Sequence, residues 1–212
     1  MSTTKNAAKP RSQEVAERFP RDVAKHQMEI IRDDGVYRHV KFHNPECSFN
    51  QWFELVTWPG VLCYHGGMGT YAFSRITDMF AFFRQGGEGI NLYYWSQKCI
   101  AEDRYGKIKE YSHDEFVSVV RESADEWADG MSEDEKKRFL AAVEKDVIRN
   151  SDDMHEVEAV RRSMEFRWNN QYPFQDFWER GCKVPSRGFL WCCHAIVWGI
   201  AKYDAARELQ TV

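Results

Sequence analysis

The chain has 212 residues, of which 43 % are hydrophobic, so it is long enough to bury a proper core without disulfides or a structural metal. Its formal net charge of −4 argues against a general nucleic-acid-binding protein, because such proteins normally present a basic face. Aromatic residues make up 15 % of the chain, a share that favours a dense core, exposed interface residues, or both.

Residues 1–27 are polar, rich in small residues and interrupted by proline, and they predict a flexible tail. This tail is basic, since it holds six Lys or Arg against three Asp or Glu. Its pattern allows a short helix over 12–18 that ends before Pro20. We expect residues 28–212 to form a single α+β domain with a helical C-terminal lobe.

Four short segments rich in β-branched and aromatic residues follow the tail, and they predict an antiparallel β-meander over about residues 36–75. In the first segment, Val40 and Phe42 alternate with polar residues, as expected for a strand with one buried face. Turn residues separate the segments, which cover 37–42, 52–58, 61–65 and 70–74.

The stretch CYHGGMGTYAF, residues 63–73, resembles a phosphate-binding loop in its glycine content. Phosphate loops lead from a strand into a helix, whereas the segments on both sides of this stretch predict strands. We therefore interpret it as a hairpin, in which Gly66 and Gly67 supply positive φ angles and Gly69 relaxes a bulge.

The rest of the chain predicts helices packed on the sheet. Capping boxes with Ser and Glu three residues apart, at Ser112 and Ser132, predict two helix starts. A third amphipathic segment covers 154–168, and residues 189–203 are apolar on all faces, which indicates a central helix. The fold prediction is thus α+β, with the meander packed against a mostly helical C-terminal part.

No motif in the sequence points firmly to catalysis. Cys63 and His65 are two apart on one predicted strand, so both face the same side and could pair a thiol with a base. Asp34 and Glu54, with His39 nearby, could contribute to an enzyme acting on nucleic acid or a nucleotide signal. We keep this enzyme as the alternative, and we expect no catalytic residues, cofactor or metal site, since paired zinc-ligand spacings are absent from the sequence.

Protein binding is the main hypothesis, because the helices and sheet are unable to bury every aromatic residue. Two turns, near 64–71 and 172–178, are the expected aromatic contact sites, and the acidic segment 101–165, with nineteen Asp or Glu against eleven Lys or Arg, offers a charged surface. The predicted partner-binding residues are Trp58, Tyr64, His65, Met68, Tyr71, Tyr172, Phe174 and Trp178. The predicted acidic surface comprises Asp125, Asp129, Glu133, Asp134, Asp152 and Asp153.

The runs FELVTWPGVLCYHGGMGTYAFSRITDMFAFFR and FLWCCHAIVWGIAKYDAA resemble an uncharacterised family of accessory proteins from tailed bacteriophages and prophages. The resemblance covers about residues 28–205. Because the family is uncharacterised, it carries over no catalytic residues; it implies a bacteriophage protein engaged in host–virus interaction. By analogy with other small phage proteins, we expect an inhibitor of a host bacterial system, such as CRISPR or another antiviral defence.

The expected partner is thus a host bacterial protein or protein complex in the host cytoplasm. The six Cys, without a secretory signal, favour reduced thiols in a cytosol, and we expect no membrane association. Nucleic acid is expected only through the basic N-terminal tail, and the sequence leaves the oligomeric state open.

Overall fold

In a computed structural model the chain forms two compact units, and the structure describes residues 9–47, 49, 51–84 and 89–210. The sheet unit combines the chain up to Ile108 with the chain from Pro185 onward. The helical unit, Lys109–Val184, is inserted between these two segments. The single domain with a helical C-terminal lobe, expected over 28–212, stays a prediction; the inserted helices have a hydrophobic core of their own.

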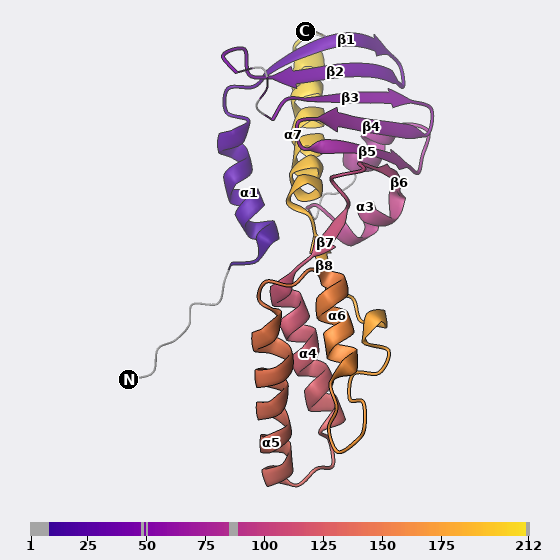
Figure 1. Ribbon diagram of the computed structural model, residues 1–212. Helices are drawn as coiled ribbons and strands as arrows, with labels where there is room; N and C mark the ends of the chain where they lie inside the picture. The colour runs from indigo at the N-terminus through magenta and orange to yellow at the C-terminus, as the bar shows by residue number, and fades with distance from the viewer. Residues whose placement is uncertain (1–8, 48, 50, 85–88, 211–212) are drawn as a thin grey trace. The chain divides into compact units, whose positions relative to one another are not determined.

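The protein is an α+β protein, as predicted, and its main sheet is an antiparallel meander (Figure 1). Six strands lie side by side in chain order, and the outermost two, which the sequence analysis missed, extend the predicted four-stranded core at both edges. The strands are β1 (Gln27–Asp34), β2 (Tyr37–His43), β3 (Phe53–Trp58), β4 (Val61–Gly66), β5 (Gly69–Ser74) and β6 (Cys99–Glu102).

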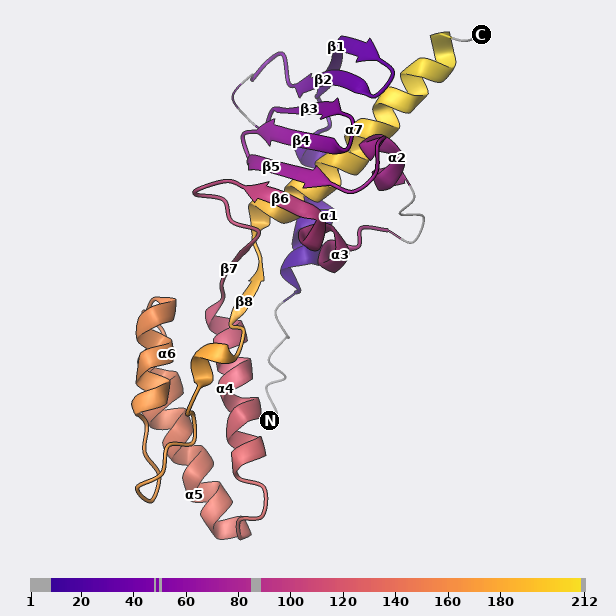
Figure 2. The same cartoon turned by 90° about the vertical axis from the view of Figure 1, so that its right-hand side faces the viewer.

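Alternation along the strands gives the sheet one apolar face. Phe42 on β2 stacks on Phe53 of β3 with ring centroids 4.6 Å apart, and Phe53 stacks in turn on Tyr64 of β4 at 5.6 Å. Helix α7 (Arg187–Gln210) runs along this face (Figure 2), and its Trp191 ring lies 5.7 Å from that of Phe53. The central, all-round apolar helix predicted over 189–203 is therefore confirmed.

Three further helices complete the sheet unit: α1 (Arg11–Asp22), α2 (Met79–Arg84) and α3 (Leu92–Lys98). Helix α1 contradicts the predicted flexible tail for residues 9–27, because Val15 and Phe19 are buried and the Phe19 ring contacts Trp191 at 5.1 Å. Residues 1–8 of that predicted tail lie outside the described residues. Apolar residues four positions apart thus hold α1 against α7 although the segment is polar on average.

The glycine-rich stretch forms the hairpin between β4 and β5, as predicted. The roles of the glycines differ from the prediction, since Gly69 has the positive φ angle, +119°, and Gly66 and Gly67 do not. Position 66 requires glycine for a different reason, because a Cβ atom there would lie 2.3 Å from the backbone oxygen of Trp52. The hairpin therefore passes too close to the neighbouring backbone for any side chain at Gly66.

We expect Gly66→Ala to lower the free energy of unfolding by about 2 kcal/mol, because the added methyl group forces the two backbones apart. Gly67→Ala is the matched control, since its Cβ would meet its nearest atom at an ordinary 3.5 Å. Urea unfolding followed by circular dichroism measures both variants. Equal losses of stability in the two variants would contradict the close-approach argument.

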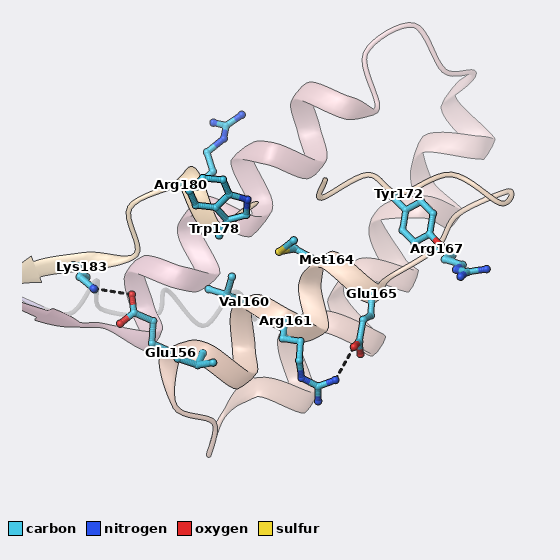
Figure 3. A pocket seen from close by; sticks show the side chains of 11 residues that line it. Glu156, Val160, Arg161, Met164, Glu165, Arg167, Tyr172, Trp178, Arg180 and Lys183 are labelled. Atoms are coloured by element: carbon cyan, nitrogen blue, oxygen red, sulfur yellow. Dashed lines mark hydrogen bonds and ion pairs between the residues drawn. The ribbon is translucent and has the colours of Figure 1, made fainter. Parts of the chain in front are cut away.

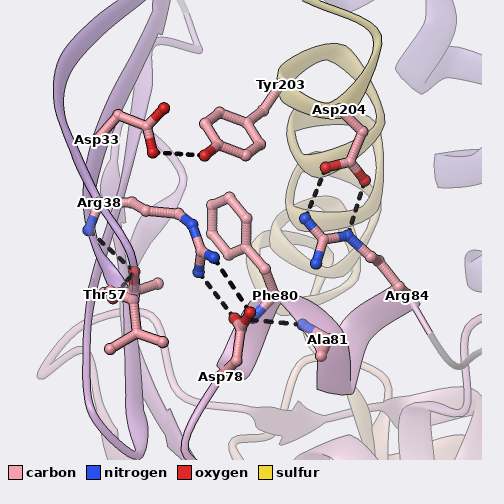
Figure 4. Close-up of polar contacts among 10 residues, drawn as sticks. Asp33, Arg38, Thr57, Asp78, Phe80, Ala81, Arg84, Tyr203 and Asp204 are labelled. Carbon is pink, nitrogen blue, oxygen red and sulfur yellow. Dashed lines mark hydrogen bonds and ion pairs between the residues drawn. The ribbon is translucent and has the colours of Figure 1, made fainter. Parts of the chain in front are cut away.

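A bidentate ion pair holds the β1–β2 hairpin to the start of α2 (Figure 4). Arg38 on β2 donates to both carboxylate oxygens of Asp78, at 2.8 and 3.1 Å, and Asp78 also accepts the backbone N–H of Phe80 at 2.9 Å. Burial alone would raise the pKa of Asp78, but the hydrogen bonds and charge of Arg38, with the backbone N–H donors, outweigh it and lower that pKa.

Two contacts bring α7 into the same region of the sheet unit. The Tyr203 hydroxyl donates to Asp33 at 2.6 Å, and Arg84 forms a bidentate pair with Asp204 (Figure 4). The Arg38 guanidinium lies over the ring of Phe80, 4.8 Å from its centroid. The charged side chains that approach the core at this end of the sheet are thus paired with one another, although the Nε atom of Arg38 is buried without a hydrogen-bond partner among the described residues.

The helical unit is built from three α-helices, a small ribbon and short irregular turns. Both predicted helix starts are present, since Ser112 and Ser132 are the N-caps and their hydroxyls accept backbone N–H groups three residues later, at 3.3 and 3.4 Å. The elements are β7 (Lys109–Tyr111), α4 (His113–Trp127), α5 (Glu133–Val143), η1 (Glu144–Ile148), η2 (Arg149–Ser151), α6 (Glu156–Glu165), η3 (Phe177–Glu179) and β8 (Lys183–Pro185). Phe139 lies at the centre of the aromatic core of this unit, against Trp127 and Trp168.

Candidate protein-binding groove

Three of the predicted partner-binding residues are buried, which corrects that prediction. Tyr64 and Tyr71 are both 0 % exposed, because strand alternation places them on the inner face of the sheet, and the Tyr71 hydroxyl donates to the carbonyl oxygen of Gly106 at 2.6 Å. Phe174 is also buried, in the core of the helical unit. None of the three side chains is available to a partner in this fold.

The other five predicted residues retain exposed surface, but they belong to two different units. Trp58, His65 and Met68 lie on or beside the strands of the sheet unit, where Met68 is only partly exposed. Tyr172 and Trp178 lie in the helical unit, with 46 % and 63 % of their surfaces exposed. The structure thus brings together only Tyr172 and Trp178, at one open groove.

This groove has a volume of about 900 Å³ and is bordered by α6, the turn that follows it, η3 and the start of β8 (Figure 3). Its apolar lining consists of Val157, Val160 and Met164 from α6, together with Tyr172 and Trp178. In Figure 3, Val160 and Met164 point from the helix into the space below Trp178. The groove therefore presents apolar side chains from three segments of one unit to solvent.

Helix α6 lines the groove because it carries two apolar stripes. Ala159 and Ser163, one turn apart, are buried on the side of the core. Val157, Val160 and Met164 follow a second stripe with the spacing i, i+3, i+7, and Val157 is 80 % exposed. Val160 and Met164 are half-buried against the same core, whereas Val157 projects beyond it, so the second stripe remains only partly covered.

A tight turn after α6 sets the far edge of the groove. Asn169 and Asn170 have φ angles of +49° and +64°, a conformation that Asn tolerates better than most residues, and Trp168 and Gln171 exchange backbone hydrogen bonds across them. The turn places Tyr172 beside Arg167, whose guanidinium lies 4.8 Å from the centre of the tyrosine ring.

Four cations and two carboxylates also line the groove. Glu165 pairs with Arg161 at 2.6 Å and Glu156 pairs with Lys183 at 3.0 Å, both within the lining. Arg180 pairs with Glu126 of α4 at 2.6 Å. The apolar floor is thus bordered by charged groups, an arrangement typical of protein interfaces with an apolar centre and a polar rim.

The predicted acidic residues are all exposed in the helical unit, on α4, α5 and the connections that follow them. Asp125 lies 3.4 Å from Lys136, and Asp152 lies 3.6 Å from His113, so part of this charge is paired locally. Glu133 and Asp134 occupy the first turn of α5, where negative charge stabilises the helix. A partner-binding role for this acidic surface stays a prediction.

The alternative enzyme hypothesis rests on side chains of the outer face of the sheet, where His39, Glu54, Cys63 and His65 alternate with buried residues. Asp34 is the last residue of β1, next to the turn into β2. His39 contacts Glu54 at 2.9 Å, while the His65 ring contacts the Thr70 hydroxyl at 2.9 Å. Burial raises the pKa of the Cys63 thiol, which disfavours the thiolate that a nucleophile requires. These contacts bind each histidine to a sheet neighbour rather than assembling a thiol–imidazole pair.

Within the described ranges, no three His, Cys, Asp or Glu side chains gather closely enough to hold a metal ion. None of the helices in the described part of the chain has the length and apolar character needed to cross a membrane. A comparison of the chain with protein-family models, curated proteins and solved structures found no match.

The sequence analysis missed Val157, Val160, Met164 and Arg167 as groove residues. Residues 154–168 are amphipathic, but their apolar positions do not fit one stripe. The two offset stripes of α6 were the available signal, together with the Asn169–Asn170 pair, which favours a tight turn.

Proposed function

We propose that the protein acts by binding another protein through the groove of its helical unit. The observation that supports this proposal most directly is the exposed apolar lining formed by Val157, Tyr172 and Trp178. Apolar side chains gathered at one exposed place are typical of interaction sites in proteins that are otherwise well packed. Trp and Tyr are also the residues on which binding energy most often concentrates.

The setting of this binding follows from the resemblance to bacteriophage accessory proteins. In this proposal the chain is a non-enzymatic phage protein that works in the cytoplasm of the bacterial host. It inhibits a host protein or complex, such as an antiviral defence system, by covering a surface that the host machinery needs. The groove supports protein binding as the mode of action, and the phage setting rests on the sequence resemblance alone.

We expect Trp178→Ala to remove a host protein that co-purifies with the chain in stoichiometric amount. Trp178 supplies much of the exposed aromatic surface of the groove, and truncating an interface Trp costs about 2 kcal/mol or more, roughly a thirtyfold loss of affinity. The test is affinity purification of the tagged chain from its bacterial host, followed by mass spectrometry and an activity assay of the captured protein.

Trp58→Ala is the matched control, because Trp58 is an exposed Trp of the sheet unit, with 42 % of its surface accessible. Capture that survives Trp58→Ala and disappears with Trp178→Ala supports the groove. The reverse result would place the interface on the sheet unit and refute the proposal. Circular dichroism of both variants checks that the folds are intact.

A further inference from the structure

Arg167 differs from the other three cations that line the groove, because it is not paired with a carboxylate in the described part of the chain. Arg161, Arg180 and Lys183 each pair with a carboxylate of the helical unit. Arg167 stacks on Tyr172, and among the residues that the structure describes no carboxylate lies within ion-pair distance of it. The guanidinium of Arg167 thus has hydrogen-bond donors to spare at the edge of an apolar surface.

The surroundings make this cation unusual. Residues 109–184 hold nineteen Asp or Glu against twelve Lys or Arg, so the helical unit as a whole is acidic. A partner that covered Arg167 with apolar groups alone would strip water from a charge without replacing its hydrogen bonds, which is costly. A partner carboxylate placed on Arg167 removes this cost and adds a charge-assisted, planar pair.

The shape of the apolar lining indicates the form of the occupant. Val157, Val160 and Met164 run along two turns of α6, over about 10 Å at the helical rise per residue. The lining is made almost entirely of side chains from helices and turns, so recognition depends on side-chain packing rather than on pairing with an open strand edge. Amphipathic helices bind such grooves through apolar residues spaced i, i+3 or i+4, and i+7.

We propose that the groove binds an acidic amphipathic helix of the partner protein. Its apolar side chains pack between α6 and Trp178, and a Glu or Asp at its edge pairs with Arg167 above Tyr172. This inference rests on the proposed function and specifies the chemistry of its partner. It predicts that the affinity gained from the pair with Arg167 shrinks as salt is added, because this pair lies at the rim of the groove.

The test uses three fluorescent peptides of about 15 residues, a length at which helices begin to form alone. The peptides share apolar residues at helical spacing and differ only on their polar face, which carries Glu, Gln or Lys. Anisotropy titration with the full chain at low salt should show the Glu peptide binding about tenfold or more tighter than the Lys peptide. This difference should shrink at high salt.

Arg167→Glu should weaken binding of the Glu peptide about tenfold, the change expected for reversing one paired charge. Arg162→Glu is the control: it makes the same charge change on α6, at a residue outside the groove lining, and should alter affinity by less than about twofold. Circular dichroism verifies that both variants fold.

Equal binding of the three peptides overturns the inference, as does preference for the Lys peptide or absence of binding at about 1 mM. The proposed function, binding of a host protein through the groove, is tested separately by the Trp178→Ala purification. If the peptides fail but Trp178→Ala still loses the co-purified host protein, the groove binds a protein of other chemistry. If Trp178→Ala retains that protein, the function itself is refuted.

Discussion

Replacing Asp78 with Ala should lower the free energy of unfolding of the sheet unit by about 3–5 kcal/mol, the loss typical of breaking a largely buried ion pair. The side chains of Arg38 and Asp78 are only 10 % and 29 % exposed, so the variant leaves a guanidinium without its carboxylate in a poorly solvated place. Helix α2 also loses the acceptor for the N–H groups of Phe80 and Ala81. Urea unfolding measures the loss.

Asp204→Ala is the matched comparison for that variant. It breaks a second bidentate pair, with Arg84, whose side chains are 36 % and 35 % exposed. Water replaces much of the lost interaction there, so we expect a loss of about 1 kcal/mol or less. If both variants lost the same stability, the burial of the Arg38–Asp78 pair would not be the cause.

The same pair predicts the acid sensitivity of the sheet unit. The pKa of Asp78 is lower in the folded protein than its usual value, so the carboxylate binds its proton more readily in the unfolded chain. Its contribution to stability is complete above the unfolded pKa of about 4 and is lost as the pH falls through the folded pKa. Asp78→Asn should therefore flatten the decline of stability below about pH 4 in denaturant titrations.

Phe139→Ala should cost the helical unit about 3–5 kcal/mol, the range for removing a fully buried Phe. The Phe139 ring is 0 % exposed and lies 4.8 Å from Trp127 and 5.5 Å from Trp168, centroid to centroid. Hydrogen exchange by mass spectrometry should show faster exchange in α4 and α5. Exchange in β2–β5 should stay unchanged, because the sheet unit has a separate core.

Val157→Ala provides the control, because Val157 is largely exposed and its truncation should change stability by less than about 0.5 kcal/mol. If Phe139→Ala accelerated exchange in the strands as much as in the helices, the two units would unfold together and the prediction would be wrong.

The strands with the clearest alternation were the ones that the sequence predicted. In β2 and β3 large apolar side chains, Val40 and Phe42, then Phe53 and Leu55, stand two positions apart, so the period identifies the buried face although Arg38 and Thr57 also lie on it. Edge strand β1 was missed because Glu29, Arg32 and Asp34 give it a polar composition. Tyr64 shares the face of Leu62, so the same alternation buries it although it lies near a turn that was expected to be an aromatic contact site.

Composition also misled the interpretation of the N-terminal segment. Averaged over 1–27 the chain is polar, yet Val15, Phe19 and Val23 are four residues apart and form a buried stripe. Pro20 lies in the last turn of α1 and does not end the helix before it. The groove was harder to predict, because the exposure of Val157 depends on which stripe of α6 the core covers, and that choice is made by tertiary packing.

The insertion of the helical unit sets the order in which the protein is able to fold on the ribosome. The strands β1–β6 emerge first, but their apolar face is covered by α7, which is synthesised only after all of Lys109–Val184. The helical unit is contiguous in the chain and is able to close its core earlier. Until α7 is made, Phe42, Phe53 and their neighbours on the nascent sheet lack the helix that covers them, and transiently exposed apolar surface of this kind is prone to aggregation.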